Sequence, residues 1–340
     1  METTELPGEA RVAPLLPPSQ QQQQQQRQWQ RQRRRLTHLL RVTTAAAPLS
    51  SPAVAAPSST PATDPTAAGA PACPTGGTYQ ELRARFQLEE GYTQLNHGSF
   101  GCCPTEVADV QVQLLRRAEQ NPDKWIGHHG LELSYHPLLN AGRAKLAEYC
   151  NADLNDLVLV ENASVGMNSV LRGQPWAPGD KLLCLDTAYG MVKNVLAHLV
   201  RERGVEVVEV SLAADSAWGQ TGHVTAAAVM DAVKRTVSEH GGPGAFRMAC
   251  VSHITAYPAA LMPVQAFCAY LSPHGCAVVV DGAHAIGQIA IDLPALGCAA
   301  YTANLHKWFF TPKGTAFLWV RAQCVCSGVL GLDLASSSHT

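Results

Sequence analysis

From Gly77 to Val320, short apolar runs alternate with longer segments in which apolar and polar residues mix at helical spacing. The runs are five to seven residues long and rich in Val, Leu and Ala. Such runs are typical of strands that are buried on both faces. They predict seven strands: Leu157–Glu161, Lys181–Asp186, Val205–Ser211, Arg247–Ser252, Ala277–Asp281, Ala299–Ala303 and Thr315–Val320.

The segments between these runs predict helices, namely Ser164–Arg172, Tyr189–Arg203, Thr225–His240 and Val264–Ser272. Strands that alternate with helices favour a mostly parallel sheet covered on both faces. The sequence therefore predicts the α/β class, with seven strands in one doubly wound layer spanning residues 77–320. Residues 321–340 show no further alternating unit, and we expect an irregular tail there.

The first 76 residues differ in composition from the rest. They hold a glutamine run (Gln20–Gln26), an arginine cluster (Arg31–Arg35) and an Ala/Pro/Ser/Thr tract (Thr43–Ala72). These segments have too few apolar side chains to offset the entropy cost of ordering, so we expect a disordered low-complexity tail.

The composition of this tail is also relevant to the cellular compartment in which the protein resides. Between Arg11 and Gly76 there are seven arginines and a single acid, which is typical of organelle transit peptides. Three glutamates within the first nine residues are not typical of such peptides. We expect a cytoplasmic protein, with a mitochondrion or plastid as the alternative if the tail is a transit peptide.

Charge and cysteine content narrow the class of protein. The net charge of −2 argues against a bulk electrostatic grip on nucleic acid or anionic lipid, and no apolar run approaches the ~20 residues of a membrane span. Eleven scattered cysteines do not suggest a disulfide framework. No ligand spacing joins the histidines of residues 97–136 to a cysteine, so we expect no metal site.

Three stretches at strand ends carry candidate chemistry. Asp281 follows an apolar strand, where ligands of open α/β sheets bind, although Asp before a helix is also a common N-cap. Lys307 precedes the aromatic pair Trp308 and Phe309; partial desolvation would free its amine for Schiff-base chemistry, but a surface lysine lying over aromatics has the same sequence. Ser164 could cap a helix with or without a bound phosphate.

Taken together, these stretches fit pyridoxal-5′-phosphate (PLP). A helix N-terminus suits its phosphate, a strand-end carboxylate suits its pyridine nitrogen, and a lysine suits its aldehyde. The sequence therefore predicts a PLP enzyme in which Lys307 and Asp281 are catalytic.

Four motifs give the chain a family resemblance: Leu95–Pro104, Ser252–Thr255, Asp281–His284 and Asn304–Trp308. The chain resembles the class V aminotransferase group of PLP enzymes, which have the aspartate-aminotransferase-like fold. Within this group it is most similar to isopenicillin-N-epimerase-like proteins and plant-type L-cysteine desulfhydrases. The resemblance covers about Tyr92 to Val320.

The resemblance implies roles for individual residues. It makes Lys307 the Schiff-base lysine, Asp281 the partner of the pyridine nitrogen and His284 the residue that hydrogen-bonds the phenolic oxygen of the cofactor. The remaining implied contacts are to the phosphate by Ala163, Ser164, Asn304 and His306, to the ring by Tyr189, and to the substrate entrance by Asn96 and His97.

The chain departs from its family in two places. Related cysteine desulfurases carry an asparagine shortly after the Ser-His pair, whereas Thr255–Pro258 stand here. The small C-terminal domain of the family, which supplies an arginine for the substrate carboxylate, is not found in this sequence. Loss of that clamp would weaken substrate binding, so a catalytically impaired PLP-binding protein is one alternative.

The activity implied by the resemblance is carbon–sulfur cleavage of a small amino acid such as cysteine, giving sulfide, pyruvate and ammonia. Epimerisation and amino transfer use the same site and remain alternatives. The resemblance also implies a homodimer.

Overall fold

The computed structural model describes residues 79–127, 134–212 and 224–326. Residues 1–76, for which the sequence predicts a disordered tail, lie outside these ranges. All described residues belong to one compact unit of the chain, which lies within Cys73–Thr340.

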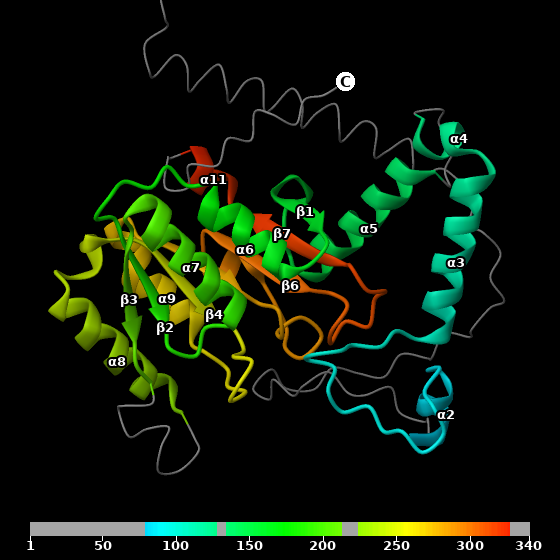
Figure 1. Cartoon of the computed structure of the whole chain (residues 1–340), viewed down its shortest axis with the longest axis horizontal. Coiled ribbons are helices and arrows are strands. Elements are labelled where there is room, and N and C mark those ends of the chain that lie inside the picture. The colour runs from blue at the N-terminus through cyan, green and yellow to red at the C-terminus, as the bar shows by residue number, and fades with distance from the viewer. Residues whose placement is uncertain (1–78, 128–133, 213–223, 327–340) are drawn as a thin grey trace, which may run out of the picture. The chain divides into compact units, whose positions relative to one another are not determined.

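Seven strands of the described residues form one sheet, in the order β1-β7-β6-β5-β4-β2-β3 (Figure 1). Six strands run in one direction, and β7 is antiparallel to both of its neighbours, β1 and β6. The mostly parallel sheet confirms the sequence prediction. The strands are β1 (Leu157–Val160), β2 (Lys181–Leu185), β3 (Glu206–Val210), β4 (Phe246–Ser252), β5 (Ala277–Asp281), β6 (Ala300–Asn304) and β7 (Ala316–Val320).

The four predicted helices are present, each within one residue of its predicted bounds. They are α6 (Ala163–Arg172), α7 (Gly190–Arg203), α8 (Ala226–Glu239) and α9 (Val264–Leu271). The structure adds helices that the sequence analysis did not predict: α2 (Tyr79–Ala84), α3 (Thr105–Gln120), α4 (Pro122–Ile126), α5 (Tyr135–Tyr149), α10 (Leu293–Leu296) and α11 (Ala322–Cys326).

Helix α11 corrects one expectation. The segment from residue 321 was expected to be irregular, but its described part contains this short helix, in which Cys324 packs against the core. The remainder, from residue 327, lies outside the described residues. None of the described helices combines the length and apolarity that a membrane span requires.

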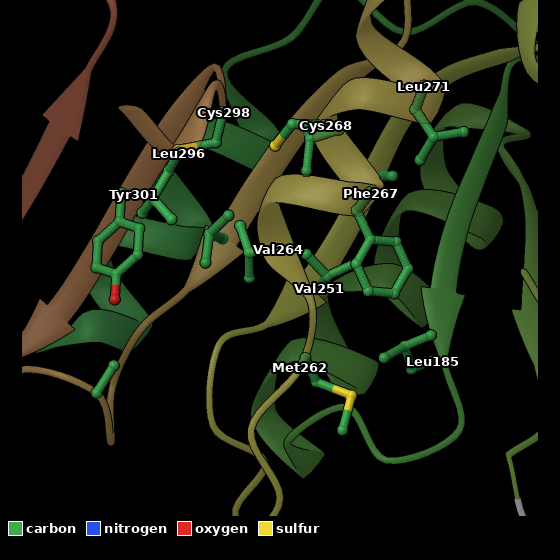
Figure 2. Packing of buried hydrophobic residues seen from close by; sticks show 14 of the residues in the cluster. Leu185, Val251, Met262, Val264, Phe267, Cys268, Leu271, Leu296, Cys298 and Tyr301 are labelled. Carbon is green, nitrogen blue, oxygen red and sulfur yellow. The ribbon is translucent and has the colours of Figure 1, made fainter. Parts of the chain in front are cut away.

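Two apolar clusters cover the two faces of the sheet, because alternate strand residues point to opposite sides. Leu182 and Cys184 of β2 pack with α6 and α7, whereas Leu183 and Leu185 pack with α8 and α9. Figure 2 shows the second cluster, in which Phe267 of α9 lies among strand residues that include Leu185. Burial on both faces explains why the strands read as apolar runs.

The parallel strands bring distant parts of the chain to one edge of the sheet. The carboxyl ends of β1, β4, β5 and β6 are followed respectively by Glu161, His253, Gly282 and Leu305. Ligands of open α/β sheets bind outside these ends. The predicted site residues that follow β1, β2, β5 and β6 are therefore gathered at this edge.

Candidate active site

Lys307 lies three residues beyond β6, in the turn that leads to the reversed strand β7. Its side chain is half-buried, and its Nζ atom lies 6.0 Å from the centre of the Tyr189 ring. Burial lowers the pKa of Lys307, and the nearby carboxylate of Asp281 partly opposes this effect. An amine with a lowered pKa is more often unprotonated and can act as a nucleophile or base.

His284 contacts this lysine directly. Its Nε2 atom lies 3.1 Å from Nζ of Lys307, and its Nδ1 atom accepts a hydrogen bond of 3.4 Å from the indole N–H of Trp308. Burial, followed by the charge of Lys307, lowers the pKa of His284 to about 4. The imidazole is therefore neutral at neutral pH.

Asp281 is the last residue of β5 and is buried, with 6% of its surface exposed. Its Oδ1 atom accepts a hydrogen bond of 3.0 Å from the backbone N–H of Ala283, and no described residue donates to Oδ2. Burial raises the pKa of Asp281, while Ala283 and the charge of Lys307 oppose the rise. A buried carboxylate with an open oxygen suits a cationic N–H partner.

The N-terminus of α6 differs in detail from its prediction. Asn162, not Ser164, is the N-cap, and its side chain accepts a hydrogen bond from Val165 N. The N–H of Ala163 donates to Oδ1 of Asn304 at 2.8 Å, so the expected backbone contact of Ala163 with a phosphate is not available in this arrangement. Ser164 keeps both its N–H and its hydroxyl open among the described residues, because the N-cap side chain serves Val165 instead.

Asn304 and His306 are the two further residues predicted on the phosphate side, and only Asn304 contacts this helix end among the described residues. Asn304 is buried and ties β6 to α6 through Ala163. The Nδ1 atom of His306 lies 2.8 Å from the carbonyl oxygen of Thr315 and 3.3 Å from the backbone nitrogen of the same residue. A carbonyl oxygen can only accept, so the shorter contact favours a proton on Nδ1, which leaves Nε2 as an acceptor when the ring is neutral. Burial lowers the pKa of His306, with the carbonyl of Thr315 acting in the opposite direction. In this tautomer His306 cannot donate from Nε2 to an anion.

The predicted entrance motif, residues 95–104, passes directly over Lys307. A Cβ atom at Gly101 would lie 1.9 Å from the carbonyl oxygen of His306 and 2.9 Å from Cα of Lys307. A Cβ atom at Gly98 would lie 2.9 Å from the ring of His284. Gly101 is therefore required by the close approach of two backbone segments, and Gly98 by the close approach of the backbone to the His284 ring.

The two entrance residues of this motif take different positions. His97 packs against the rings of Trp308 and Phe310, with centroid distances of 5.6 and 5.1 Å. Burial, and then the charge of Lys313, lowers the pKa of His97. Asn96 is exposed, and its side chain accepts a hydrogen bond from the backbone N–H of Ser99. The structure thus brings His97 to the aromatic wall of the site, whereas Asn96 stabilises the turn.

The sequence analysis missed the parts played by Trp308, His253 and Phe310. Trp308 bonds His284, and His253 supports β5 by donating its backbone N–H to the carbonyl oxygen of Asp281 at 2.8 Å. Phe310 has a φ of +58°, which a residue with a Cβ adopts at a cost, and such strain is concentrated at functional sites. The aromatic pair that follows Lys307 in the sequence was a signal that could have pointed to Trp308. The backbone conformation of Phe310 has no signal in the sequence.

The residues present fit PLP. An amine, a buried carboxylate with an open oxygen and an open helix N-terminus match the aldehyde, the pyridine nitrogen and the phosphate. Thr187, just after β2, adds a buried hydroxyl oxygen that has no hydrogen-bond partner among the described residues. Within the same residues, no group of three or more metal-ligating side chains could hold a metal ion.

Comparison with known proteins agrees with this fold and identifies the family. Residues 102–327 match the aminotransferase class-V family, and the chain belongs to that family. The chain is 35% identical over 251 residues to a putative L-cysteine desulfhydrase 1 of Oryza sativa subsp. japonica, covering 71% of this chain and 50% of that protein. It is 32% identical to a putative L-cysteine desulfhydrase 2 of the same plant, covering 77% of this chain and 55% of that protein.

Two further likenesses are more distant. Isopenicillin N epimerase of Amycolatopsis lactamdurans is 29% identical, with 71% of this chain and 56% of that protein covered. A solved structure of a C-DES mutant, with glycine covalently linked to its PLP cofactor, has a TM-score of 0.61 at 23% identity and covers 72% of this chain and 60% of that one. This likeness supports the fold. The chain spans about half the length of the plant relatives.

Proposed function

We propose that this chain binds PLP through Lys307 and cleaves the carbon–sulfur bond of cysteine or a similar small amino acid. The observation that carries the proposal is the placement of Asp281 at the end of β5 and of Lys307 just beyond the parallel neighbour β6, with His284 against the lysine amine. When bound, the cofactor supplies an electron sink that makes the Cα proton of the substrate acidic.

Three protein residues have separate roles in this proposal. Asp281 accepts the pyridine N–H with its open oxygen and keeps that nitrogen protonated, because a buried carboxylate is stabilised by a cation. Ser164 binds the phosphate with its N–H and hydroxyl at the positive end of the α6 dipole. Lys307 takes the Cα proton on Nζ.

The structure also supports a dry site. The 95–104 segment lies over the backbone of Lys307, and the rings of His97, Trp308 and Phe310 form an apolar wall beside it. Excluding water strengthens the interactions of Lys307 and Asp281 with a bound ligand.

The choice of elimination rests on the relatives, of which the two most similar reported above carry desulfhydrase names. The test supplies PLP and L-cysteine to the purified chain and follows sulfide and pyruvate, with Lys307→Ala as the control. A D-amino acid product would support epimerisation instead, and a new amino acid formed from a keto acid would support amino transfer. A Lys307-dependent adduct without turnover of any amino acid would support a binding protein.

Assembly and compartment complete the proposal. We infer a homodimer in the cytoplasm, as the family resemblance and the composition favour. Light scattering of the purified chain tests whether it is a dimer. Imaging a fluorescent fusion of the whole chain tests the compartment, and plastid or mitochondrial signal that is lost with residues 1–76 would assign the tail as a transit peptide.

A further inference from the structure

Trp308, His284 and Lys307 form a short chain of hydrogen bonds. The indole Nε1 of Trp308 lies 3.4 Å from Nδ1 of His284, and Nε2 of His284 lies 3.1 Å from Nζ of Lys307. Within the described part of the chain, His284 is the hydrogen-bond partner of the Trp308 indole, and no second acceptor competes for it.

The hydrogen atoms of this chain are determined by what each group can do. An indole N–H can only donate, and a neutral imidazole has one N–H and one lone pair. Since Trp308 donates to Nδ1, the lone pair of His284 lies on Nδ1 and its proton lies on Nε2. The Nε2–H group then points to Lys307, which can accept it only as an unprotonated amine.

The opposite tautomer would have the opposite effect. With the proton on Nδ1, two N–H groups would face each other at 3.4 Å, and Nε2 would accept from a protonated lysine. We propose that Trp308 is a positioning residue, which fixes the Nε2–H tautomer of His284 and thereby keeps Lys307 as the free amine. This inference rests on the proposed role of Lys307 in binding the cofactor.

Other groups around Lys307 act on the same equilibrium. The carboxylate of Asp281 favours the protonated lysine, whereas burial favours the unprotonated amine. The neighbouring His306, whose own pKa is lowered, carries no negative charge that would stabilise a protonated lysine. The ring of Tyr189 lies 6.0 Å from Nζ. His97 packs on the indole ring of Trp308, and burial, followed by the charge of Lys313, lowers its pKa. Asp281 is therefore the group that most favours the protonated form of Lys307, and the Nε2–H tautomer of His284 favours the unprotonated form.

The first measurement is nitrogen NMR of the full chain with labelled histidine, after dialysis against hydroxylamine to strip any bound carbonyl compound. The signals of His284 are assigned by their loss in His284→Gln. We expect a protonated Nε2 and an unprotonated Nδ1 in the wild type, and a shift toward the other tautomer in Trp308→Phe, which keeps an aromatic ring against His97. A wild-type His284 that carries its proton on Nδ1 overturns the proposal.

The second measurement is the pH dependence of labelling at Lys307 in the same cofactor-free protein, read by mass spectrometry of the peptide. Trp308→Phe should move the labelling midpoint upward by about one pH unit. Trp125→Phe in α4, whose indole makes no hydrogen bond to His284 in the described part of the chain, should not move it. In the His284→Gln background the effect of Trp308→Phe should vanish.

An effect that persists in the His284→Gln background would show that the indole acts through packing and would overturn the tautomer account. Both measurements use protein without cofactor or substrate. They therefore succeed or fail independently of the carbon–sulfur lyase activity, which only turnover assays address.

Discussion

The Nε2 atom of His284 lies 3.1 Å from the Nζ atom of Lys307, although the residues are 23 positions apart in the chain. The contact exists because β5 and β6 are parallel neighbours, and each residue follows the carboxyl end of its strand. Burial lowers the pKa of Lys307, so the half-buried amine beside this neutral imidazole is more often unprotonated than an exposed lysine. This pair distinguishes Lys307 from an ordinary surface lysine.

Replacing Lys307 by Ala should abolish covalent attachment of PLP, because no other amine is placed against His284 in the described residues. Borohydride reduction followed by intact-mass measurement reads this directly: one cofactor per chain in the wild type and none in the variant. Lys145→Ala, which alters an exposed lysine paired with Glu148, is the matched control. Equal labelling of Lys307→Ala would assign the attachment to another lysine.

Asp281→Asn should reduce turnover on the order of a hundredfold or more while leaving attachment to Lys307 intact. The amide keeps the oxygen that accepts from Ala283 N–H but cannot hold a proton on the pyridine nitrogen. Reductive trapping and a turnover assay on the same preparation separate the two effects. Unchanged turnover would remove Asp281 from the mechanism.

The same variant makes a prediction about stability without cofactor. Burial raises the pKa of Asp281 in the folded chain above its unfolded value of about 3.9, so the folded state binds the proton more tightly. Its stabilising contribution is complete below the unfolded pKa and is lost as the pH rises through the folded pKa. Urea unfolding across this interval should show that Asp281→Asn gains stability relative to the wild type as the pH rises. A constant difference between the two proteins would contradict this account.

Ser164→Ala should weaken the binding of PLP by about tenfold and leave the binding of pyridoxal, which lacks the phosphate, nearly unchanged. The reason is that the hydroxyl at the start of α6 is open to a phosphate. Ser169→Ala is the control, because the hydroxyl of Ser169 already donates to the carbonyl oxygen of Val165 in the same helix. Equal weakening for both ligands would place the phosphate elsewhere.

Gly101→Ala should destabilise the chain by about 1–3 kcal/mol or displace the 95–104 segment, because the added Cβ would lie 1.9 Å from the carbonyl oxygen of His306. Chemical denaturation measures the first outcome, and slower reductive trapping at Lys307 measures the second. Gly142→Ala in α5 has open space around its Cβ and should instead stabilise by about 0.5–1 kcal/mol. Wild-type behaviour of Gly101→Ala would refute the close approach.

His253 should make the protein sensitive to acid. It is buried against the hydroxyl of Tyr301 at 2.9 Å, and burial lowers its pKa from 6.5 to about 4. A lowered histidine pKa gives stability that is present above the unfolded pKa and is lost as the pH falls from 6.5 toward 4, by about 3 kcal/mol. His253→Gln should flatten the stability profile over this interval, whereas the exposed His274→Gln should not. A profile as steep as that of the wild type would exclude His253 as the cause.

The sequence by itself determined the seven strands and four of the helices between them, α6, α7, α8 and α9. Their apolar runs follow from burial on both faces, which is a local property of each strand. It also placed Asp281 and Lys307 at strand ends, since a strand end is visible where an apolar run stops. The motifs around these two residues were enough to indicate the family.

The sequence pattern did not predict helices α3 and α5. Helix α3 contributes no buried residue, so its apolar positions are not explained by packing on the sheet. The reversal of β7 between β1 and β6 was likewise not assigned to a particular strand. Strand direction depends on how the connections pack, and the apolar runs are the same for both directions.

Only the tertiary structure decided which polar groups meet. It gave the Ala163 N–H to Asn304, which lies 141 positions away, and left Ser164 open. It also placed Trp308 against one nitrogen of His284 and Lys307 against the other. These pairings depend on strand order and on the direction of each side chain. Residue type and spacing show which groups can donate or accept, but the fold determines which partner each of them reaches.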